Sequence, residues 1–160
     1  MIFSVFKIRF FVPISLSISL LITGCSESKV SQCQRLIQVV NQGISLIDNN
    51  KGKQANTSLQ LSKDLKDVTK SLAELKFTDP KLEEFQGDFV KVFQNLSQAI
   101  AKAAQALNTA KTAEATPSGR EKIQKARTDI DSALTAAAKT AGKESDNLSN
   151  QLNKYCSQSQ

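Results

Sequence analysis

The sequence predicts an all-α protein: an up-down-up-down four-helix bundle with a projecting Ala-rich helical hairpin. Ala, Leu, Lys, Gln, Ser and Asn dominate, whereas the 160 residues include only six Gly, three Pro and no Trp or His. Apolar residues recur at alternating spacings of three and four, the period of one helix face. Four such series are separated by short turns, which favours antiparallel neighbours in a bundle.

The first two predicted helices have the same apolar spacing. The first helix has an N-cap at Ser31, turn residues at 48–52, and the face Cys33, Ile37, Val40, Ile44 and Ile47. The second has the face Leu61, Leu65, Val68, Leu72 and Leu75. Residues 76–80 then interrupt the pattern, so we expect a sharp turn between the second and third helices.

The last two predicted helices begin with a cap followed by proline. Asp79 and Thr116 suit the N-cap position, and Pro80 and Pro117 suit the first helical turn. The third face is bulky first and alanine afterwards: Leu82, Phe85, Phe89, Val92, Leu96, Ala99, Ala103, Ala106 and Ala110. The fourth face is Ile123, Ile130, Leu134, Ala138, Ala141, Leu148, Leu152 and Tyr155. Gly142 weakens this helix locally by about 1 kcal/mol.

The unequal lengths of these helices predict an elongated shape. The first helix ends near residue 48, whereas the third continues to about residue 111, and its core positions change to alanine near Ala99. We therefore expect residues 101–127 to form a two-helix hairpin beyond a four-helix body. The alternative is a long coiled coil that needs a partner chain, but four separately capped helices disfavour it.

The first 24 residues have the pattern of an export signal. Lys7 and Arg9 precede an apolar run at 10–22, which is shorter than the roughly 20 residues of a comfortable membrane span. The run ends in Ile22-Thr23-Gly24-Cys25, which resembles the lipobox of bacterial lipoproteins. This resemblance implies cleavage before Cys25 and a diacylglycerol thioether on its sulfur, usually with a third acyl chain on the new amino terminus. The alternatives are an ordinary signal peptide with an incidental cysteine and an uncleaved anchor.

This interpretation divides the chain into a cleaved signal peptide (1–24), a lipidated tether (25–31), a helical bundle domain (32–156) and a tail (157–160). It implies a membrane anchor in the bacterial cell envelope, with the protein facing the periplasm, lumen or exterior. An exported protein meets an oxidising compartment, so the two remaining cysteines, Cys33 and Cys156, should form a disulfide. An even number of antiparallel helices brings them to the same end. A redox-active or metal-binding pair is the alternative, but no C-x-x-C spacing supports it.

The composition excludes several kinds of site. Without His, the chain cannot build a His-based zinc site or a Ser-His-Asp triad, and it has no glycine-rich phosphate loop. We expect no catalytic residue, no cofactor, no metal and no nucleic-acid partner. An enzyme that uses Asp, Glu, Lys or Ser is the remaining alternative, although no cluster selects such residues.

Positive charge is concentrated in the predicted hairpin. Residues 101–127 contain six bases and two acids, a net charge of +4. Four of the bases lie near the start of the fourth helix, where the helix dipole disfavours cations: Arg120, Lys122, Lys125 and Arg127. They could bind an acidic protein surface, a polyanionic envelope polymer or anionic lipid. The alternative is a solubilising surface with scattered bases.

These observations favour a lipid-anchored, exported helical protein with a structural or protein-binding role at the cell envelope. Its anchor, size and bundle are similar to those of the PsbQ-like proteins of photosystem II, which dock on the lumenal side of a membrane complex. The alternative is a binder of a small apolar ligand, such as a lipid or pigment, between the helices. Under that alternative Phe85, Phe89 and Phe93 could line a pocket, whereas in a filled bundle they are a core stripe.

Overall fold

The computed structural model describes residues 27–50, 55–138 and 142–158, which contain five helices and no strand. The all-α prediction is therefore confirmed for this part of the chain. The helices are α1 (Lys29–Asn50), α2 (Ala55–Glu74), α3 (Pro80–Lys111), α4 (Pro117–Ala137) and α5 (Lys143–Ser157). The signal peptide, Cys25 and the predicted turn residues 51–52 lie outside the described residues.

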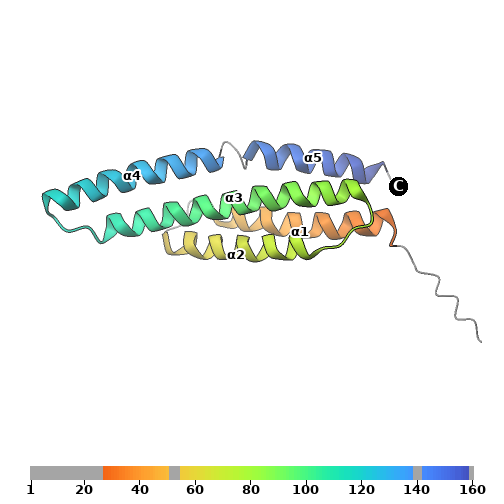
Figure 1. Cartoon of the computed structure of the whole chain (residues 1–160), viewed down its shortest axis with the longest axis horizontal. Helices are drawn as coiled ribbons and strands as arrows, with labels where there is room; N and C mark the ends of the chain where they lie inside the picture. Colours follow the sequence, from red (N-terminus) through yellow and green to blue (C-terminus); the bar gives the residue numbers. More distant parts are fainter. Residues whose placement is uncertain (1–26, 51–54, 139–141, 159–160) are drawn as a thin grey trace, which may run out of the picture.

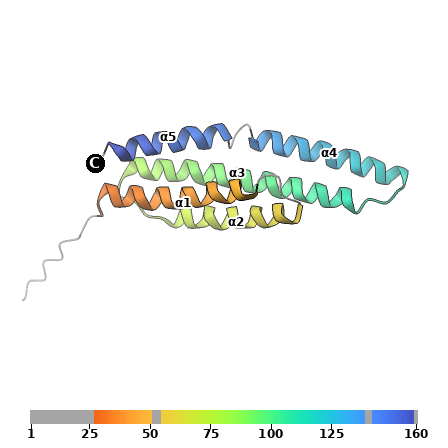
Figure 2. The same ribbon diagram turned by 180° about the vertical axis from the view of Figure 1, so that it is seen from behind.

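The helices lie side by side in an elongated molecule (Figure 1). The long helix α3 has α1 and α2 on one side and α4 and α5 on the other, as the reverse view also shows (Figure 2). We call the end that holds the start of α1, residues 75–79 and the end of α5 the proximal end. The distal end is the α3–α4 turn at residues 112–116, and α3 and α4 run past the ends of α1 and α2 to reach it.

The predicted fourth helix is described as two helices, α4 and α5, and residues 139–141 between them lie outside the described residues. Gly142, expected to weaken the helix, immediately precedes α5.

The core is in the proximal half, where helices from both sides of α3 meet. Its largest fully buried side chains come from α1, α2, α3 and α5: Leu36, Leu65, Leu72, Leu82, Phe89, Phe93 and Leu152. The predicted faces of α2 and α3 supply most of this core. Leu36 is an addition, because it lies one turn from the predicted core residues Cys33 and Val40 on a wider apolar stripe. Phe93 is buried, as expected of the predicted core stripe of phenylalanines.

Two of the three predicted N-caps are confirmed. The Asp79 carboxylate accepts hydrogen bonds from two amides of α3, and the Thr116 hydroxyl accepts one from Gly119. The prediction of Ser31 as the first cap is wrong, since α1 begins two residues earlier, at Lys29. The Ser28 hydroxyl instead accepts a hydrogen bond from the Ser31 amide at 3.2 Å. Ser31 is three residues after Ser28, as is usual for the amide that a capping side chain accepts from.

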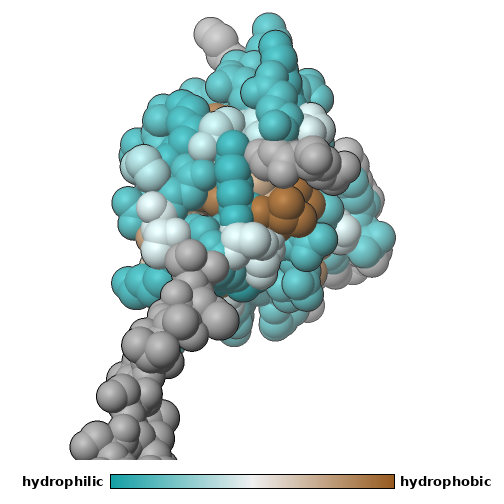
Figure 3. Space-filling view, turned by 90° about the vertical axis from the view of Figure 1, so that its right-hand side faces the viewer, coloured by the Kyte–Doolittle hydropathy of each residue, from teal (hydrophilic) through white to brown (hydrophobic). Residues whose placement is uncertain are grey.

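Several bonds tie the chain together at the proximal end. The predicted Cys33–Cys156 disulfide is present, with 5.9 Å between the two Cα atoms. Beside it, the Tyr155 hydroxyl donates to the Asp79 carboxylate at 2.9 Å. The buried Gln32 side chain accepts a hydrogen bond from the Thr78 amide at 2.8 Å, which attaches α1 to the α2–α3 turn. Figure 3 shows this end as a mostly hydrophilic surface around a small hydrophobic patch.

A candidate apolar binding pocket

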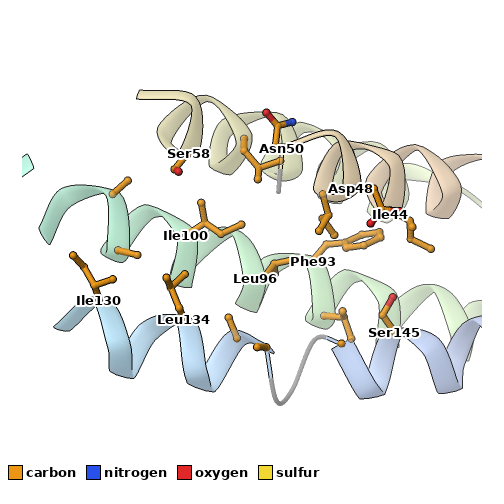
Figure 4. A pocket seen from close by; sticks show the side chains of 18 of the residues that line it. Ile44, Asp48, Asn50, Ser58, Phe93, Leu96, Ile100, Ile130, Leu134 and Ser145 are labelled. Carbon is orange, nitrogen blue, oxygen red and sulfur yellow. The ribbon is translucent and has the colours of Figure 1, made fainter. Parts of the chain in front are cut away.

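A pocket of about 730 Å³ lies against α3 where its neighbours end. The last turns of α1 and the first turns of α2 form one wall, and the end of α4 with the start of α5 forms the opposite wall (Figure 4). Small-molecule sites in proteins usually enclose about 300–1,000 Å³. The pocket is therefore large enough for a ligand of ordinary size.

The lining is mainly aliphatic. Its larger side chains include Ile44, Ile47, Leu96, Ile100, Ile130 and Leu134. Ala103, Ala104, Ala137 and Ala138 contribute small surfaces between them. Leu134 is 46% exposed, so the pocket meets solvent beside α4.

The pocket exists because α1 and α2 extend less far toward the distal end than the apolar face of α3 does. The helix α1 ends at Asn50, α2 begins at Ala55, and the face of α3 has changed to alanine by Ala103. Alanine cannot fill the space that a missing helix leaves, so a void remains at this level. The change to alanine near Ala99 is therefore the sequence signal both for the predicted hairpin and for this void.

Phe93 forms the pocket wall beneath α1. Its side chain is fully buried and lines the pocket, in contact with Gly43 of α1. A Cβ atom at Gly43 would lie 2.6 Å from Cζ of Phe93, which is closer than real contacts allow. The absence of a side chain at Gly43 therefore lets the Phe93 ring lie under α1. Phe85 and Phe89 instead belong to the core stripe and do not line the pocket.

Two serines hold α2 against α3 beside the pocket. The Ser62 hydroxyl donates to the Ser97 carbonyl at 2.9 Å, and the Ser97 hydroxyl donates to the Ser62 carbonyl at 2.7 Å. Both side chains are buried, and their chain neighbours Leu61 and Leu96 line the pocket. The reciprocal bonds satisfy polar groups that would otherwise destabilise a buried interface. They also fix the position of this wall.

Polar groups are unevenly distributed around the pocket. Asp48, Asn50 and Ser58 border it at the ends of α1 and α2, and Ser145 and Asp146 border it on α5. Toward the distal end the described lining residues are apolar: Ala103, Ala104, Leu107 and Ile130. Polar groups thus border the pocket on both walls, and its distal part is apolar.

The four predicted partner-binding bases are all exposed on α4, near the distal end. Lys125 makes an ion pair with Asp129 at 2.7 Å, which reduces the charge it presents. At about 100° per residue, Arg120 and Arg127 lie about 20° apart around the helix, whereas Lys122 is about 160° from Arg120. The structure therefore does not gather the four bases on one face.

No protein-family model matches the chain, and no curated protein or solved structure shows a significant match to it. Within the ranges that the structure describes, no helix is both long and apolar enough to cross a membrane. The same residues contain no group of three or more Cys, Asp or Glu side chains arranged to hold a metal ion.

Proposed function

We propose that this protein is a lipid-anchored, exported helical protein of the bacterial cell envelope that binds a small apolar ligand between its helices. The pocket against α3 is the observation that carries this function. A filled bundle would have argued for a purely structural role, whereas an apolar void readily accepts apolar molecules. The anchor rests on the lipobox resemblance at residues 22–25, and we propose no enzymatic role.

The proposed architecture follows from the same arrangement. We interpret α1, α2, α3 and α5 as a four-helix body whose termini are near the membrane, with the α3–α4 hairpin projecting away from it. The pocket then lies where the body meets the hairpin, at the level of the last turns of α1. Burial of apolar ligand surface there contributes about 25 cal/mol per Å² to binding.

Leu134 provides a direct test of ligand binding. Because it lines the pocket and is 46% exposed, Leu134→Asp places a charge at the opening with little damage to the core. We expect this variant to bind an apolar fluorescent probe at least tenfold more weakly. Thr135→Asp, which adds the same charge at an adjacent exposed position outside the pocket, is the matched control. Equal probe binding by both variants and the unmodified protein would contradict the proposal.

A second candidate function is protein binding at the distal end, as in a peripheral subunit of a membrane complex similar to PsbQ-like proteins. The observation that favours it is the exposure of Arg120, Lys122 and Arg127, which form no ion pair with another described residue. This function is compatible with a ligand in the pocket, because these bases do not line it.

A further inference from the structure

We infer that the pocket holds a single extended acyl chain that belongs to a separate lipid molecule. This inference rests on the proposed function and specifies the ligand. It is argued from the length of the pocket, the chemistry of its walls and its distance from the proposed anchor.

The pocket is elongated along α3. Its lining on α3 runs from Val92 to Leu107, fifteen residues apart, which corresponds to about 22 Å along the helix. An extended hydrocarbon chain can contact apolar walls along this whole length, whereas a compact ring system would contact only part of it.

The walls have the chemistry of a chain-binding site. Phe93 is the one aromatic residue among the described lining residues, and the others that are apolar are Ile, Leu, Val, Ala and Gly. Aromatic ligands gain from stacking on aromatic side chains, which this lining hardly offers. Methylene groups need only non-directional contacts with aliphatic walls. The apolar distal part would receive the end of the acyl tail.

The lipid proposed on Cys25 is poorly placed to occupy this pocket. Cys25 precedes Lys29, the first residue of α1, by four positions. The nearest lining residue of α1, Ile44, is a further fifteen residues along the helix, about 22 Å away. An acyl chain attached at residue 25 would have to leave the membrane and follow α1 before it entered the pocket. The occupant is therefore a different molecule, such as a free fatty acid or a membrane phospholipid.

The test uses the mature chain that begins at residue 25, with Cys25→Ser to remove its own lipid. Unbranched fatty acids of increasing length compete with a fluorescent fatty acid, and a sterol serves as a rigid polycyclic competitor. Each buried methylene should strengthen binding about fourfold until the pocket is full, after which affinity should level off. Single-chain phospholipids of matched chain length show whether the head of the lipid also contributes.

A matched pair of variants locates the end of the bound acyl chain in the pocket. Ala103→Leu fills the distal part of the pocket, so affinity should level off at a shorter chain length. Ala136→Leu makes the same change at an exposed position outside the pocket and should leave the length dependence unchanged. Unchanged melting temperatures would show that both variants remain folded.

The possible results separate the inference from the proposed function. Length-dependent chain binding that Ala103→Leu shortens supports both. Tighter binding of the sterol than of any fatty acid would overturn the acyl-chain inference but would still support binding of an apolar ligand. Binding of neither class would overturn both. If the lipidated protein on vesicles excludes the fluorescent fatty acid while the Cys25→Ser chain binds it, the occupant is the protein's own lipid and the separate-molecule inference is wrong.

Discussion

Asp79 connects three parts of the proximal end through one carboxylate. It caps α3 by accepting from the amides of Lys81 and Leu82, and it accepts a hydrogen bond from Tyr155 near the chain terminus. Partial burial raises the pKa of Asp79, but these hydrogen bonds and the positive charge of Lys29 outweigh it. The net pKa therefore lies below its ordinary value of 3.8.

This lowered pKa predicts how stability depends on pH. Because the folded-state pKa is the lower one, the contribution of the carboxylate is complete above about pH 3.8 and is lost as pH falls through the folded-state value. Asp79→Asn keeps a good cap but no charge, so its stability should depend less on pH than that of the unmodified protein as pH falls below about 3.8. Asp79→Ala should be destabilised by about 0.5–2 kcal/mol even at neutral pH, from loss of the cap. Urea unfolding across pH measures both, and identical pH dependence in the unmodified protein and Asp79→Asn would contradict the assignment.

Gly43 predicts an effect on both stability and the pocket. Gly43→Ala places a methyl group against the Phe93 ring, so Phe93 must shift, and we expect destabilisation by about 1–3 kcal/mol. Gly87→Ala is the control, because nothing lies within 4 Å of its added Cβ and alanine favours the helix by up to about 1 kcal/mol. In thermal unfolding, Gly87→Ala should have the highest melting temperature, the unmodified protein an intermediate one and Gly43→Ala the lowest. A displaced Phe93 should also weaken probe binding, and unchanged stability and binding in Gly43→Ala would contradict this description of the contact.

At the scale of elements, α5 depends on its attachment at the proximal end. Only Leu152 and Cys156 are buried in this helix, with Leu148 and Tyr155 partly buried against the core, so few apolar side chains hold it against α1 and α3. The disulfide to Cys33 spans 123 residues of sequence, and loop entropy gives it a contribution of about 5 kcal/mol.

Reduction should therefore destabilise the whole molecule and expose α5 first. The expected result is a clearly lower urea midpoint in the reduced protein and faster hydrogen exchange in residues 143–157 than in α3. Cys33→Ser with Cys156→Ser is the variant that removes the bond without a reductant. Equal midpoints with and without the bond would contradict this role of the disulfide.

Sequence patterns predicted elements well where a local rule determines them. Asp79-Pro80 and Thr116-Pro117 located two helix starts, because capping depends on neighbours within one turn. The face of α4 was predicted less well: Leu134 is exposed, whereas Gly119 and Ala126 are buried. The reason lies in tertiary packing, because close contact between α3 and α4 favours small residues and Leu134 borders the pocket. The pocket itself depends on where three helices end relative to one another, which periodicity alone does not specify.

At the scale of the whole molecule, the lipidation that we propose at Cys25 would determine how the described helices are presented. The sequence Ile22-Thr23-Gly24-Cys25 predicts that protein extracted from membranes consists of residues 25–160 plus acyl mass. Intact mass spectrometry measures this, and Cys25→Ser should release or mislocalise the protein, because stable anchoring needs more than one chain. An unmodified mature mass, or a chain that still begins at Met1, would rule out the lipoprotein interpretation.

The distal end gives a further prediction at this scale, because it lies at the opposite end of the molecule from α1's first residue and hence from the proposed anchor. Its turn is closely packed, because a Cβ atom at Gly119 would collide with the carbonyl oxygen of Glu114. The exposed bases Arg120, Lys122 and Arg127 follow this turn on α4. If they bind an acidic partner, the interaction should weaken with salt, since the screening length is only about 8 Å at physiological ionic strength.

Two variants with equal loss of charge separate binding at this end from a general effect of charge. One replaces Arg120, Lys122 and Arg127 by Gln, and the other replaces the exposed bases Lys63, Lys66 and Lys154 by Gln. After crosslinking in native membranes, the first variant should recover less of any salt-sensitive partner, and its remaining recovery should depend less on salt. The second should behave like the unmodified protein, and both should keep its helical signal. If the first variant also recovers as much as the unmodified protein at low and physiological salt, these bases serve only to solubilise the hairpin.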